Sequence, residues 1–164
     1  MFTDLAWLIP WLLLLHVLGA IVAFGPTFAF PIIGSMGGAE PMHGNFATRV
    51  SETVSSRIVY PIGITLPITG ALLILVSGRD LSARDNWWLG IAIILYVIAY
   101  GYSFFYQRKI VERIIALTSG PPPPGASGPP PELPPLVKQV QRGGMFLTVL
   151  LVLIIFLMVV KPAF

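Results

Sequence analysis

Cysteine is absent from this chain of 164 residues, and charged residues are scarce. The absence of cysteine excludes disulfide bonds, thiolate metal sites and cysteine-ligated iron–sulfur clusters. Asp, Glu, Lys and Arg make up 10% of the chain, against about 25% in soluble domains. Hydrophobic residues reach 55%, more than a soluble protein of this length could bury. The composition therefore predicts a protein that lies in a lipid bilayer.

Four apolar stretches are long enough to cross a bilayer as helices, which takes roughly 20 residues each. They are residues 5–30, 58–77, 87–106 and 143–160. None alternates apolar and polar residues as a membrane β-strand does. In lipid, only helices and closed barrels satisfy their backbone hydrogen bonds. We therefore predict an all-α membrane protein, a single domain over residues 1–164 built as a bundle of four transmembrane helices.

The N-terminal sequence MFTDLAW has no basic residue, and no small-residue cleavage site follows it. This pattern is not that of a removable signal peptide, so the first helix is expected to be an uncleaved membrane anchor. The net charge of +3 does not indicate nucleic-acid binding, because the Lys and Arg residues sit beside the ends of the predicted helices. The expected partner is the bilayer of the inner cell membrane, crossed several times, and no nucleic acid.

The basic residues predict which side of the membrane each loop faces. The loops after the first and third predicted helices contain seven of them, Arg49, Arg57, Arg108, Lys109, Arg113, Lys138 and Arg142. The opposite side contains three, Arg79, Arg84 and Lys161. Cytoplasmic loops carry the excess of Lys and Arg. Both termini should therefore lie outside, with the first and third loops in the cytoplasm.

The first predicted helix carries one ionisable residue near its middle, His16. Small residues follow it at spacings that share one helical face: Gly19, Ala20, Ala23 and Thr27. Lipid offers an imidazole no hydrogen bond, so a histidine on such a face should point toward protein or a bound group. His16 is therefore the candidate cofactor or metal ligand, and a buried structural histidine is the alternative. No residue pattern indicates a catalytic group.

Two tyrosines of the third predicted helix are candidate partners for His16. Tyr96 and Tyr100 are four residues apart, so they share a helical face, and their expected depth is similar to that of His16. A phenol near the middle of a membrane needs a hydrogen-bond partner. We expect His16 to lie near this face and to pair with one of the two hydroxyls or with a backbone carbonyl. Tyr96 and Tyr100 thus join His16 as cofactor-binding candidates, although such a pair can also serve packing alone.

Residues 34–57 form the predicted first cytoplasmic loop, and it is amphipathic. Apolar residues recur at every fourth position from Phe46 to Ile58, which predicts a helix beginning near Asn45. Just before it, Met42 and His43 could contribute two metal ligands, but a solvated loop is the simpler interpretation. Upstream, Gly25-Pro26 predicts a kink in the first helix, followed by unwinding over residues 33–38.

The predicted third loop combines a helical extension with a proline-rich connector. Residues 107–117 keep apolar side chains on one face, so the third helix is expected to continue to Leu117. Residues 120–135 contain nine prolines and predict a polyproline II or disordered cytoplasmic connector. The fourth helix is expected to restart near Leu136 and to pack through Gly143 and Gly144.

Two segments of the chain carry a resemblance to known membrane proteins. LHVLGAIVAFG in the first helix and YPIGITLPITGALLIL in the second contain the motifs His-x-x-Gly and Thr-Gly-x-Leu. In these the chain resembles the four-helix integral membrane proteins related to copper-resistance D and HemJ-type proteins. The resemblance implies haem or copper binding, with His16 at the position of the first-helix histidine. The third helix lacks the lysine and histidine of the HemJ pattern, which argues against the protoporphyrinogen oxidase activity of that group.

Two functions lead from the sequence, and a transporter is a third, which would call for intramembrane charges or inverted repeats that the sequence does not display. One is a small non-enzymatic membrane protein, an accessory or scaffold subunit that binds other membrane subunits or a second copy of itself. The other is a membrane redox protein that binds haem b or a metal through His16. The absorption spectrum of the purified protein separates them, since only the second hypothesis predicts a Soret band.

Overall fold

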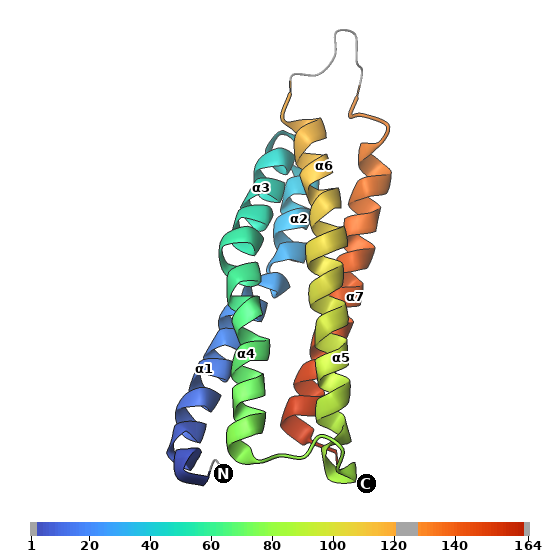
Figure 1. Ribbon diagram of the computed structural model, residues 1–164. Coiled ribbons are helices and arrows are strands. Elements are labelled where there is room, and N and C mark those ends of the chain that lie inside the picture. The colour runs from blue at the N-terminus through green and yellow to red at the C-terminus, as the bar shows by residue number, and fades with distance from the viewer. Residues whose placement is uncertain (1–2, 121–127, 163–164) are drawn as a thin grey trace.

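The computed structural model describes residues 3–120 and 128–162, and this part of the chain consists of helices joined by short connections, with no strand. Four helical stretches in it are long and apolar enough to cross a membrane: Leu5–Ala39, Pro41–Ser77, Arg84–Thr118 and Leu133–Val160. They run up and down alternately, so that the first stretch begins and the fourth ends at the same end of the bundle (Figure 1). The predicted all-α bundle with four spans is confirmed.

The first stretch changes direction where two prolines enter it. It consists of the 3₁₀ turn η1 (Thr3–Leu8), α1 (Ile9–Phe24), the 3₁₀ turn η2 (Gly25–Phe28) and α2 (Phe30–Ala39). The predicted break at Gly25-Pro26 is confirmed by η2. The predicted unwinding over residues 33–38 is wrong, because α2 is helical through them. Its Gly37 packs so closely on Ala47 of the next helix that tertiary packing outweighs the low helix propensity of glycine.

The second stretch is one continuous rod from the predicted loop into the second span. It contains η3 (Pro41–His43), α3 (Gly44–Val54), the π-helical turn η4 (Ser55–Val59) and α4 (Tyr60–Ser77). The helix predicted to begin near Asn45 is confirmed as α3. Pro61 has no amide hydrogen for the carbonyl of Arg57, four residues earlier, and the π turn lies at this defect in the ladder.

The third stretch repeats this design, and the fourth is a single helix. The third contains η5 (Arg84–Asn86), α5 (Trp87–Gly101), the π-helical turn η6 (Tyr102–Gln107) and α6 (Arg108–Thr118), which confirms the predicted extension past the span. The fourth is α7 (Leu133–Val160), which begins three residues before the expected restart because prolines fit the first turn of a helix. Within the proline-rich connector, residues 121–127 lie outside the described residues.

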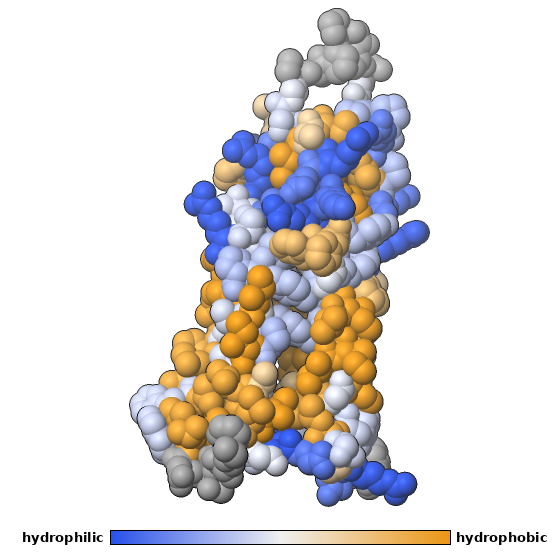
Figure 2. All heavy atoms as spheres, viewed as in Figure 1, coloured by the Kyte–Doolittle hydropathy of each residue, from blue (hydrophilic) through white to orange (hydrophobic). Residues whose placement is uncertain are grey.

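The helices form a spanning part and a polar head. In the spanning part α1 packs mainly on α4 and α5 mainly on α7, while the head is built by α2, α3, α6 and the start of α7. Figure 2 shows apolar side chains over the spanning part and polar ones around the head. The tightest core lies near the terminal end, where Trp88, Leu89, Ala92 and Leu157 are buried together. The head is fastened by Arg108, which lies 3.5 Å from Glu52 and 2.8 Å from Glu112.

Candidate functional site

His16 lies on the face of α1 that packs against α4. Its Nδ1 is 2.8 Å from Oγ1 of Thr69. The next residue of α4 is Gly70, and a Cβ added there would lie 3.4 Å from Cε1 of His16. The ring is half-buried. The imidazole therefore lies against α4 at Gly70, beside its hydrogen-bond partner Thr69.

The hydroxyl of Thr69 has three acceptors within reach of its one hydrogen. Oγ1 is 2.8 Å from Nδ1 of His16, 3.0 Å from the carbonyl of Thr65 and 3.1 Å from that of Leu66. When the hydroxyl donates to its own helix, Nδ1 of His16 carries the hydrogen and Nε2 keeps its lone pair; when it donates to Nδ1, Nε2 carries the hydrogen. Either tautomer binds the imidazole to α4.

The small-residue stripe below His16 faces the same helix. A Cβ added at Gly19 would lie 3.2 Å from Cδ2 of Leu66, and Ala23 is fully buried. His16 thus meets Thr69 and Gly70 across the interface between α1 and α4, and Gly19 meets Leu66 of the same helix. The prediction that His16 points toward protein is confirmed by this packing.

Tyr96 and Tyr100 of α5 bind the backbone of α4. The hydroxyl of Tyr96 donates to the carbonyl of Gly63 at 2.6 Å, and that of Tyr100 donates to the carbonyl of Tyr60 at 3.0 Å. The Gly63 carbonyl lacks the usual hydrogen-bond donor of an α-helix, because the residue four positions later is Pro67, which has no amide hydrogen. Tyr96 supplies the missing donor from another helix.

Gly63 also makes room for the two phenols. A Cβ added there would lie 2.7 Å from Cε2 of Tyr100 and 3.4 Å from the hydroxyl of Tyr96. The two rings stack with their centroids 6.0 Å apart. Gly63 therefore has two roles: its carbonyl lacks a helical donor and accepts the Tyr96 hydrogen bond, and its lack of a side chain leaves room for the Tyr100 ring.

The expected pairing of His16 with Tyr96 or Tyr100 is wrong, because all three side chains have other partners on α4. His16 contacts α4 at Thr69 and Gly70, whereas the phenols contact it at Gly63 and Tyr60, more than one turn nearer the head. The depth of a residue in the membrane, counted along the sequence, could not show that α4 lies between α1 and α5. The three candidates are thus linked through one helix and do not form a single cluster.

The second histidine lies elsewhere. His43, in η3 at the head, has Nδ1 2.8 Å from Oε2 of Glu40, and both side chains are exposed. Met42 beside it is also exposed. Among the residues that the structure describes, no three His, Asp or Glu side chains come together as a metal cluster. Within one chain, His16 could therefore supply a single histidine ligand.

One polar residue was missed by the sequence analysis. Gln107, at the end of η6, donates from Nε2 to the carbonyl of Val140 at 3.1 Å, while its Oε1 is buried and lacks a hydrogen-bond partner. A Cβ added at Gly143 would lie 2.0 Å from that oxygen and 2.7 Å from the hydroxyl of Tyr102. The expectation that the fourth helix packs through its glycines is confirmed for Gly143. A polar residue at the end of a span, opposite a glycine pair, was the available signal.

The fold and these contacts define a multi-pass helical integral membrane protein whose polar side chains join its helices. Residues 10–162 match the family described as "Predicted integral membrane protein (DUF2269)", and the chain belongs to that family. No curated protein and no solved structure gives a significant match to the chain.

Proposed function

We propose that the protein is a non-enzymatic accessory or scaffold subunit of a membrane complex. The observation that carries this proposal is an uncovered glycine face on α2. A Cβ added at Gly34 or at Gly38 would meet no atom within 4 Å. The neighbouring Gly37 is already used against α3. Two glycines four residues apart allow another helix to approach the backbone closely, as in membrane helix pairs.

The surroundings of this glycine face favour a helix of another subunit as its partner. Ser35 lies between the two glycines in the sequence, and its hydroxyl is bonded to its own helix at 2.8 Å. The exposed Ile32 and Met36 project from other sides of α2, so the contact would be carried by the small-residue face itself, which lets helix backbones approach closely in lipid. The occupant would be a membrane helix that lies along α2 at the junction of span and head.

A photo-crosslinking experiment in native membranes tests this proposal. A crosslinkable residue replaces Ser35, and the matched control replaces Val97, which is exposed on α5. We expect one adduct of defined mass at Ser35, none at Val97, and loss of the adduct in the Gly34→Leu/Gly38→Leu variant. An adduct of twice the mass of the chain would identify a second copy as the partner. Absence of any adduct at Ser35 would refute the scaffold function.

The proposed placement is the inner cell membrane, with both termini outside and the head in the cytoplasm. The excess of Lys and Arg at the head end supports it. The common end at which α1 begins and α7 ends is compatible with that orientation (Figure 1).

The second candidate function is a membrane redox protein that binds haem b or a metal through His16. It is favoured by the hydrogen bond between Nδ1 and Thr69, which engages one ring nitrogen and would leave Nε2 for a ligand bond, and by the resemblance to copper-resistance D and HemJ-type proteins. Within one chain, His16 would supply one ligand to such a group. A second histidine ligand would come from His16 of another copy, because His43 lies at the head and pairs with Glu40.

Absorption spectra of the oxidised and reduced purified protein decide between the two functions. The redox hypothesis predicts a Soret band that disappears in His16→Gln and persists in His43→Gln. A parent protein purified from haem-replete cells without a Soret band or bound metal would count against it and leave the scaffold proposal standing.

A further inference from the structure

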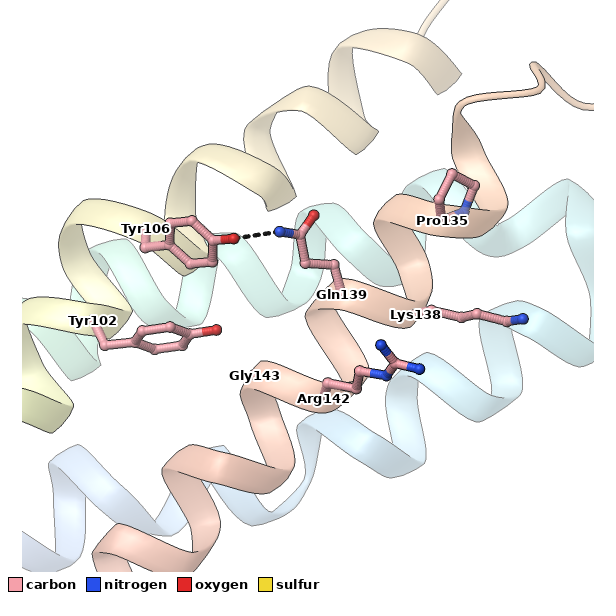
Figure 3. Close-up of a pocket in the computed structure, with 7 residues that line it drawn as sticks. All are labelled: Tyr102, Tyr106, Pro135, Lys138, Gln139, Arg142 and Gly143. Atoms are coloured by element: carbon pink, nitrogen blue, oxygen red, sulfur yellow. Dashed lines mark hydrogen bonds between the residues drawn. The ribbon is translucent and has the colours of Figure 1, made fainter.

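A pocket with a volume of about 430 Å³ lies between α7 and the π-helical turn η6. One edge is formed by Tyr102 and Tyr106, and the other by Lys138, Gln139 and Arg142 of α7. Figure 3 shows the two phenols pointing toward α7, where the Gln139 amide donates to the hydroxyl of Tyr106, while the charged ends of Lys138 and Arg142 extend together away from the phenols. The pocket therefore combines two positive charges with hydroxyl and amide groups.

The two positive charges of the pocket are not neutralised by protein. Lys138 and Arg142 are one helical turn apart, so they share a face. Among the described residues neither makes an ion pair. The acidic residue nearest in sequence, Glu132, is bound by Arg113 at 2.7 Å. The ligand that best complements the pocket is thus an anion, and a guanidinium next to an ammonium suits a phosphate group.

The position of the pocket along α7 indicates a lipid. Arg142 is the last charged residue before the apolar run from 143 to 160. On the same face, at +3, +4 and +7 from Arg142, lie Met145, Phe146 and Val149, all exposed. The ring of Phe146 packs on Tyr102 with the centroids 5.2 Å apart, so the apolar track begins at the wall of the pocket.

We propose that this pocket binds the headgroup of an anionic phospholipid, with an acyl chain lying along the track of Met145, Phe146 and Val149. Lys138 and Arg142 bind the phosphate, and the Tyr106 hydroxyl and the Gln139 amide bind polar atoms of the headgroup. Basic pockets between transmembrane helices, at the level of the headgroups, are a recurrent form of lipid recognition. A free phosphate ion would use the cations but would gain nothing from the apolar track.

Native mass spectrometry of the detergent-purified full chain measures this binding. Phosphatidylglycerol, phosphatidylcholine and inorganic phosphate are titrated separately, and the bound species are counted. The test variant is Lys138→Gln/Arg142→Gln. The matched control is Arg49→Gln/Lys109→Gln, which removes the same charge from exposed residues of the same head that do not line the pocket.

Each cation should be worth roughly fivefold in affinity, so the test variant should bind phosphatidylglycerol about 25-fold more weakly than the parent. We expect the control variant to keep parental affinity, and phosphatidylcholine to bind the parent more weakly than phosphatidylglycerol. Met145→Gln, on the acyl track, should weaken phosphatidylglycerol without reducing the number of charges. Equal losses in test and control variants would overturn the proposal. Displacement of the lipid by an equal concentration of inorganic phosphate would overturn it too, in favour of a free-anion site.

Discussion

The bond from Tyr96 to the Gly63 carbonyl should matter only while Pro67 is present. Tyr96→Phe removes the hydroxyl and keeps the ring, so Gly63 loses the donor that replaces the missing amide hydrogen of Pro67. Pro67→Ala restores an amide at that position. In the Pro67→Ala background, the Gly63 carbonyl can regain its own helical bond, and the Tyr96 hydroxyl becomes dispensable.

The expected magnitudes follow from the surroundings of this bond. Interhelical hydrogen bonds in membranes contribute about 0.6 kcal/mol on average and up to about 1.7. The Gly63 bond is short, at 2.6 Å, and its acceptor lacks an intrahelical donor. Tyr96→Phe should therefore cost about 1.5 kcal/mol in the parent and below about 0.5 kcal/mol with Pro67→Ala, a coupling near 1 kcal/mol.

Reversible unfolding in mixed micelles, followed by circular dichroism, measures the four free energies of this cycle. Tyr100→Phe is the matched control, because Tyr100 donates to the carbonyl of Tyr60, and Ile64, four residues later, has its own amide hydrogen. Its cost should be the same with Pro67 or Ala at position 67. Equal costs of Tyr96→Phe in both backgrounds would refute the role assigned to the proline.

Two further predictions concern the head and the orientation. Gly37→Ala should destabilise the protein by about 1–3 kcal/mol, because its Cβ would lie 2.7 Å from that of Ala47. Gly38→Ala is the matched control and should be tolerated, because its Cβ would meet no atom within 4 Å. Thermal unfolding in detergent compares the two variants, and equal melting temperatures would contradict the packing of Gly37 on Ala47. Single cysteines at Ser82 and Ser119 test the orientation in the membrane. A membrane-impermeant thiol reagent should label Ser82→Cys on intact cells, and Ser119→Cys only after the cells are permeabilised. The reverse labelling pattern would show that the proposed topology is inverted.

The spans could be predicted from the sequence to within a few residues, because apolar length is a direct physical requirement of the bilayer. The helix predicted near Asn45 followed from a period of apolar residues in the same way. Helix α2 was missed because FPIIGSMGG is rich in residues of low helix propensity, and the compensating contact of Gly37 with Ala47 belongs to another helix. Local composition cannot report such a contact.

The sequence could predict which residues belong to the candidate site, but it could not predict which of their side chains bind each other. Depth along a helix can be counted from the sequence, and it placed His16 near Tyr96. The direction in which a side chain points around its helix axis depends on which helices pack against that helix. Here the side chains of His16 and Tyr96 both bind α4. One pairing did have a sequence signal: Pro67 leaves the Gly63 carbonyl without its helical donor, so a donor from another helix was to be expected there.

The geometry of α4 also bears on how the sequence resemblance should be interpreted. His16 contacts Thr69 and Gly70, and Gly19 packs on Leu66 about one turn nearer the head, so the residues of both motifs lie in the interface between α1 and α4. Close packing of two membrane helices uses such small and polar residues without any cofactor. Packing alone can therefore account for these residues. A redox function would need something packing does not require, namely a group bound at Nε2 of His16.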